Sequence, residues 1–142
     1  MIPFGDKTVT LYNRYQHKIE GKTVTEYVRR AMTGCFWKNE RVMTFAENVK
    51  LATFKTVCKI PESALYVDPL TWADDDADRA NHFTLALGDV IVLGAVTDEV
   101  GESMSITALL AKYKPSGAMT VEVAADNTGS MRALGHYKAT GA

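Results

Sequence analysis

The side chains that could carry chemistry are scattered along this 142-residue sequence, and their spacing completes no known motif. His17, His82 and His136 do not lie at metal-ligand spacing from one another or from a cysteine. Cys35 and Cys58 form no CxxC pair, and no nucleophile elbow precedes a histidine. We therefore expect no catalytic residue, no metal and no cofactor, and we interpret both cysteines as buried thiols of a protein in a reducing compartment.

A run of acidic residues forms the densest charged cluster of the sequence. Its members are Asp74, Asp75, Asp76 and Asp78. Their spacing resembles the first ligands of a calcium loop, but Arg79 and Leu85 occupy the positions where that loop needs Gly and Glu. Because adjacent like charges repel, the run favours a solvated loop within an insertion over residues 68–81.

Aromatic residues with basic neighbours make binding of single-stranded nucleic acid by a small barrel an alternative function. The aromatic residues are Phe36, Trp37, Phe45, Tyr66 and Trp72, and the basic ones are Arg29, Arg30, Lys38 and Arg41. Small barrels bind single strands by stacking bases on such rings within a basic groove. The net charge of −1 supplies no long-range attraction for phosphates, so core packing or protein contact is favoured.

Alternating polar and apolar residues predict that most of the chain is β-structure. The strand-like segments are residues 8–12, 23–32, a hairpin over 35–45 with its turn at 38–41, then 52–60, 90–93 and 120–124. Ser105 as N-cap and apolar residues at helical spacing predict one short helix over 106–113, which Pro115 ends. The fold predicted is mainly β, a small β-barrel or sandwich of six to seven strands.

The predicted barrel covers residues 1–126, and residues 127–142 are predicted to be an extended C-terminal arm. This tail holds few apolar residues, among them Met131 and Tyr137, so it lacks the material for a core and fits an arm that orders on a partner. The first residues lack the pattern of a signal peptide, and the apolar run over 90–96 is too short to cross a bilayer. We expect no membrane contact.

The order of several short segments resembles a family of small structural proteins encoded among the neck genes of phages that infect Gram-positive bacteria. These segments are Val9-Thr10-Leu11-Tyr12-Asn13, the Trp-containing hairpin, Ile60-Pro61, the strand from Leu87 to Gly94, and Gly129-Ser130-Met131-Arg132. The layout is also similar to head-closure proteins, or stoppers. The insertion at 68–81 and the tail make this chain longer than that pattern.

The resemblance implies a mechanical function in the virion, after assembly in the host cytoplasm. A homo-oligomeric ring, a dodecamer or hexamer, would join the portal or adaptor to the tail-terminator protein and retain packaged DNA, which it contacts only in passing. Candidate subunit-interface residues are Trp37, Trp72, Met131 and Tyr137. An acidic loop at Asp74, Asp75, Asp76 and Asp78 would face the channel and repel DNA. A tail-completion, terminator or minor tail protein is the alternative within this class.

Overall fold

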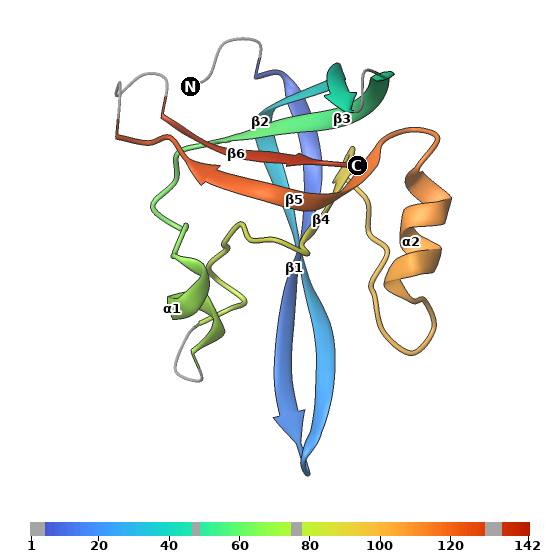
Figure 1. Cartoon of the computed structure of the whole chain (residues 1–142). Helices are drawn as coiled ribbons and strands as arrows, with labels where there is room; N and C mark the ends of the chain where they lie inside the picture. Colours follow the sequence, from blue (N-terminus) through green and yellow to red (C-terminus); the bar gives the residue numbers. More distant parts are fainter. Residues whose placement is uncertain (1–4, 47–48, 75–77, 130–134) are drawn as a thin grey trace.

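Six antiparallel strands close into a barrel in the order β1-β2-β3-β6-β5-β4, with β4 pairing back onto β1 (Figure 1). The computed structural model describes residues 5–46, 49–74, 78–129 and 135–142. The elements are β1 (Lys7–Ile19), β2 (Lys22–Ala46), β3 (Val49–Pro61), α1 (Pro69–Ala73), β4 (Val90–Leu93), α2 (Ile106–Tyr113), β5 (Ala118–Asp126) and β6 (His136–Gly141). The prediction of a mainly β fold, a small β-barrel or sandwich of six to seven strands, is confirmed, and the described chain forms the barrel with six strands.

Two strands each run through both halves of the barrel. β2 has 25 residues; it pairs with β1 as far as Cys35 and with β3 from Phe36 onward. Gly34 lies at this change of partner with φ 69°, inside a β-bulge opposite the start of β1. β5 likewise pairs first with β4 and then with β6, with a register shift after Val121. These irregularities let a single strand turn the corner between two sheets.

The apolar residues separate into two clusters on either side of the sheet. The interior of the barrel is filled by Val9, Leu11, Cys35, Cys58, Ile60, Phe83, Leu85, Ile91, Met119, Val121, Tyr137 and Ala139. The second cluster lies under α2, where Leu109 packs with Tyr12, Val90 and Val92. The Ser105 hydroxyl accepts from the Ala108 N–H at 3.1 Å, so the predicted N-cap and helix are confirmed.

The β1–β2 hairpin projects beyond the closed part of the barrel (Figure 1). Its two-residue turn is Glu20-Gly21, and both residues have positive φ, 51° and 78°, as a type I′ turn requires. Near its base, the Arg79 guanidinium lies 3.9 Å from the centre of the Tyr15 ring, which also contacts Trp72 edge-on. The segment around α1 therefore supports the hairpin from one side.

The predicted turn at residues 38–41 is wrong, because β2 continues through it to Ala46. The polar residues that suggested a turn lie where the β2–β3 hairpin begins to extend past β6: Lys38 pairs with Val57, inside the part that β6 joins, and Arg41 pairs with Phe54, beyond it. There, Lys38 and Glu40 share an exposed face and approach within 3.9 Å. A strand with one face in solvent accepts such charges, so polarity alone was a misleading turn signal.

The predicted C-terminal arm is also wrong for the described part of the tail. His136–Gly141 forms β6, which pairs with β3 on one side and β5 on the other, and Tyr137 and Ala139 are buried. The strand was hard to recognise in the sequence because it contains small residues. Gly141 is one of them, and it has to be small because a Cβ there would collide with the backbone carbonyl oxygen of Thr120 in β5. In addition, the predicted insertion contains α1, a second short helix that the sequence reading did not include.

Candidate functional site

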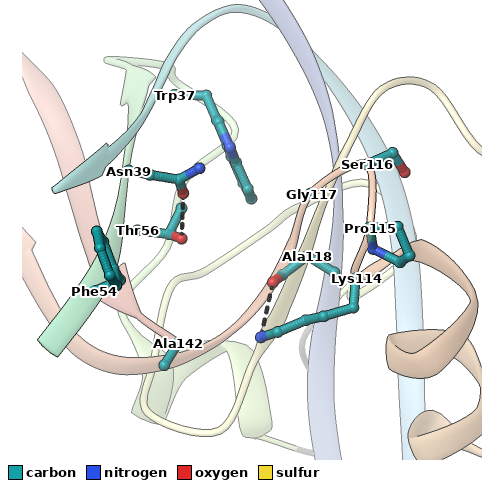
Figure 2. Close-up of a pocket in the computed structure, with 10 residues that line it drawn as sticks. All are labelled: Trp37, Asn39, Phe54, Thr56, Lys114, Pro115, Ser116, Gly117, Ala118 and Ala142. Atoms are coloured by element: carbon teal, nitrogen blue, oxygen red, sulfur yellow. Dashed lines mark hydrogen bonds between the residues drawn. The ribbon is translucent and has the colours of Figure 1, made fainter. Parts of the chain in front are cut away.

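A groove lies at the end of the barrel where the β2–β3 hairpin extends past β6 (Figure 2). β3 pairs with β6 only from Thr56 to Pro61, so its earlier residues have no strand partner on that side within the described chain. The facing wall is the turn from α2 into β5. The groove has a volume of about 340 Å³ and is lined by Trp37, Asn39, Phe54, Thr56, Lys114, Pro115, Ser116, Gly117, Ala118 and Ala142.

The groove continues the apolar interior of the barrel outward. Trp37 pairs across the strands with the buried Cys58, and Phe54 lies four residues earlier on the same face of β3. Trp37 packs against the core cluster, whereas Phe54 is 69% exposed. A Cβ on Gly117 would lie 3.3 Å from Trp37 Cζ2, so the backbone of the wall runs close to the indole. The hairpin thus contributes two aromatic side chains to the groove, a partly buried Trp37 and an exposed Phe54, with the Asn39–Thr56 pair between them.

Polar groups flank these aromatic side chains. The Thr56 hydroxyl donates to Asn39 Oδ1 at 2.8 Å, which leaves the Asn39 amide N–H groups facing the groove side of the hairpin (Figure 2). Lys114 Nζ donates to the Ala118 carbonyl at 3.3 Å from the opposite wall. Aromatic rings beside a few amide and ammonium donors suit a protein segment with apolar side chains and exposed carbonyls.

A buried polar cluster fixes the segment before β4 against β1. Asp89 is 1% exposed, and its carboxylate accepts from the Arg14 N–H at 2.8 Å, the Ala86 N–H at 2.8 Å and Asn13 Nδ2 at 2.9 Å. Asn13 Nδ2 also donates to the Thr84 carbonyl at 2.7 Å. Burial raises the pKa of Asp89 to about 6, against the lowering effect of these hydrogen bonds. The cluster joins the segment before β4 to β1 through hydrogen bonds between residues that are far apart in sequence.

The acidic residues predicted to line a channel are described only at their ends. Asp74 and Asp78 are exposed or near the surface after α1, while Asp75 and Asp76 lie outside the described residues. The Asp78 carboxylate accepts from Asn81 Nδ2 at 2.7 Å, and Arg79 donates to the Asp74 carbonyl at 2.6 Å. The role of this segment stays a prediction.

The four candidate interface residues have different positions. Trp37 lines the groove, whereas Trp72 and Tyr137 are 2% and 4% exposed and pack within this chain. Met131 lies outside the described residues. The sequence patterns did not identify Phe54 and Lys114, which also line the groove. The alternation of β3, which places Phe54 on the face of Cys58, was the available signal for Phe54.

The histidines and cysteines do not gather into one reactive centre. Cys35 and Cys58 are both free and buried in the barrel interior, and burial raises the pKa of the Cys35 thiol to about 12. Within the described ranges, no three His, Cys, Asp or Glu side chains lie close enough together to hold a metal ion. No helix in the part of the chain that the structure describes has the length and apolarity needed to cross a membrane.

The fold and the groove define a small closed antiparallel barrel with an uncovered hairpin face. Residues 4–142 match the family described as "Family of unknown function (DUF6751)", and the chain belongs to this family. Neither a curated protein nor a solved structure gives a significant match to the chain.

Proposed function

We propose that this protein is a structural component of a tailed-phage particle, a ring-forming head-closure protein of the neck. The observation that carries the proposal is the groove face of the β2–β3 hairpin, where Phe54 is 69% exposed and Trp37 lines the same groove. An exposed aromatic side chain at the mouth of a groove is a surface that a binding partner can cover. In an assembly, the neighbouring subunit is that partner.

The segmental resemblance to neck proteins adds the location, and the barrel with projecting hairpins suits a ring. In such a ring each copy would insert a segment into the groove of the next, a heterologous contact that closes after a fixed number of copies. Burial of Phe54 and the remaining Trp37 surface would contribute on the order of 2–4 kcal/mol to each contact. Portal-side and tail-side proteins would bind the two faces of the ring.

The test is a cryo-EM reconstruction of the neck of the particle that carries this chain. We expect a ring of this barrel between portal and tail, with density from a neighbouring copy in the groove. Density farther down the tail would make it a tail-completion or terminator protein. Absence from the particle would overturn the proposal and return attention to nucleic-acid binding.

A substitution pair tests the groove itself. F54D should leave the stability of the isolated chain within about 0.5 kcal/mol, because the side chain is mostly in solvent, and should prevent ring formation. L87D is the matched control, since Leu87 is 64% exposed but lies before β4, away from the groove. If F54D particles retain DNA and join tails as well as L87D particles do, the groove is not the contact.

A further inference from the structure

The groove face of the β2–β3 hairpin carries an exposed arginine directly opposite Phe54. Arg41 and Phe54 are register partners in the antiparallel pair, so their side chains lie on the same face. Trp37 and Asn39 line the groove from that face, because residues 37, 39 and 41 alternate along β2. Within the described residues, Arg41 makes no hydrogen bond or ion pair. A partner that covers Phe54 therefore also meets a guanidinium group.

A pocket near the opposite end of β3 has the complementary chemistry. This Tyr66–Asp126 pocket has a volume of about 210 Å³ and is lined by Tyr66, Pro69, Leu85, Ala124, Ala125, Asp126 and Tyr137. The rings of Tyr66 and Tyr137 stack with their centres 4.0 Å apart, and Tyr137 pairs with Ile60 of β3. Aromatic walls and a carboxylate suit a guanidinium, which stacks on rings and donates charge-assisted hydrogen bonds. The volume suits one side chain rather than a larger ligand.

The negative charge of Asp126 is available to a partner. Its Oδ1 accepts from the Thr128 N–H at 3.0 Å and from the Thr128 hydroxyl at 2.6 Å, and both donors are neutral. Oδ2 takes part in neither bond. Burial raises the pKa of Tyr66 and of Tyr137, and the charge of Asp126 raises both further, so the potential at the two rings is negative.

Exposed apolar residues adjoin the lining of the pocket in sequence. Leu70 follows Pro69 and is 85% exposed, and Val123 precedes Ala124 and is 61% exposed. A small cation would leave these side chains in water, whereas a protein surface can cover them. The groove face, with an exposed aromatic ring beside a cation, matches these surroundings in both polarity and charge.

The two surfaces lie on opposite sides of the molecule. Figure 1 shows the open end of the β2–β3 hairpin on the right, and α1 with the end of β5 on the left. One copy cannot bring its own hairpin to its own pocket, because β3 pairs with β6 between the two. Complementary surfaces at different places on one chain give a head-to-tail contact between copies, which forms a ring when the rotation closes.

We propose that Arg41 of one copy binds in the Tyr66–Asp126 pocket of a second copy, with Phe54 against the apolar residues beside that pocket. The contact rests on the proposed function, because it names the surface of the neighbouring copy that covers the groove. The Asp126 carboxylate accepts hydrogen bonds from the guanidinium, and the two tyrosine rings exclude water from them.

Photochemical cross-linking from position 54 tests which surface covers the groove. Full-length chains that carry p-benzoylphenylalanine in place of Phe54 are mixed with ¹⁵N-labelled chains, irradiated and analysed by mass spectrometry. We expect mixed-isotope peptides that join position 54 to residues 66–70 or 123–126. Cross-links to another surface of the second copy would overturn this contact and keep the groove as an interface. Absence of mixed-isotope products would overturn both.

Charge reversal tests the role of Arg41 in the same assay. R41E in the photoreactive chain should lower the yield of mixed-isotope product several-fold, because its carboxylate then meets that of Asp126. D126R in the ¹⁵N-labelled chain should restore the yield with R41E and lower it with Arg41. K22E and E102R, which reverse exposed charges elsewhere, are the matched controls and should leave the yield unchanged. Equal yields from R41E and K22E would overturn the proposal.

The place of assembly is tested separately. A neck ring in which position 54 cross-links to another surface would overturn only this contact. Cross-links to the pocket in a protein absent from the neck would overturn only the proposed location.

Discussion

Asp89 is a carboxylate held away from water. Its carboxylate is surrounded by three N–H donors, yet loss of water outweighs them and raises its pKa to about 6. The folded chain therefore binds this proton more tightly than the unfolded chain, where the ordinary pKa of 3.8 applies. The contribution of Asp89 to folding is fully present below pH 3.8 and is lost as the pH rises through about 6.

The D89N variant tests this loss of stability with rising pH, because asparagine does not titrate. The free energy of unfolding of the wild type, measured relative to D89N, should fall by on the order of 2–3 kcal/mol from about pH 4 to about pH 8. Urea titrations at constant ionic strength measure it. D89N also turns an amide N–H toward Asn13 and Ala86, so its absolute stability is lower, and the slope with pH is the informative quantity. A pH-independent difference would contradict the burial of Asp89.

Gly141 is required for space. Because a Cβ there would meet the Thr120 carbonyl, G141A should lower the free energy of unfolding by about 1–3 kcal/mol. G101A is the matched control: a Cβ at Gly101 meets nothing within 4 Å. The denaturant midpoints of the two variants measure this loss of stability. Equal midpoints would mean that Gly141 does not lie as close to the Thr120 carbonyl of β5 as described.

For single residues, the sequence predicted which of several side chains lie in the core but not which residues they contact. The alternation of residues 8–12 placed Val9 and Leu11 inside, as found. Local sequence did not mark Asp89 as buried: the Ala86 N–H is a nearby donor, but the other two donors, Asn13 and Arg14, lie far away along the chain. Partners distant in sequence are invisible to periodicity.

The β1–β2 hairpin contains one strained residue in its turn. Glu20 has φ 51°, a conformation that costs an ordinary side chain about 1 kcal/mol and that Asn tolerates better. E20N should therefore raise the free energy of unfolding by about 0.5–1 kcal/mol, measured by thermal or urea unfolding. E102N, an exposed acidic residue in the loop before α2, should change it little. An unchanged stability in E20N would show that the hairpin tip does not unfold with the barrel.

The elements that the sequence predicted well are those with local signals. α2 begins and ends where its cap, spacing and Pro115 indicate, because those signals lie within the helix and its flanks. β2 was predicted as a strand over residues 23–32 and a separate hairpin over 35–45, because the charged residues 38–41 resemble a turn. Only the pairing with β3 shows that they belong to a strand.

Closure of the whole barrel depends on β6. Without it, β3 and β5 would both lose a neighbour and Tyr137 and Ala139 would leave the core. A chain that ends at residue 127 should therefore lack a cooperative unfolding transition and near-UV circular dichroism. K138A, which keeps β6 and changes one outward side chain, should retain both. A truncated chain that unfolds cooperatively would restore the interpretation of the tail as an independent arm.

The mainly β class could be predicted from repeated strand patterns, whereas the choice between barrel and sandwich and the strand order could not. The order depends on β6 inserting between β3 and β5, and its small and polar residues gave a weak pattern. The groove depends in turn on where β6 ends relative to β3. Its position is therefore a property of the assembled barrel and has no signature in any single segment.

The pairing of β1 with β4 sets the order in which the molecule can form. β1, β2 and β3 follow one another as local hairpins, but Val9 meets Leu93 only after the intervening loop and helix α1 have been made. Contacts between residues so far apart in sequence are slow to form, so closure of the barrel is the expected rate-limiting step of folding. During synthesis the first three strands leave the ribosome as an open sheet with unpaired edges. β4 covers the edge of β1, but the edge of β3 stays unpaired until β6 emerges, so the nascent chain remains prone to aggregation until its last strand is made.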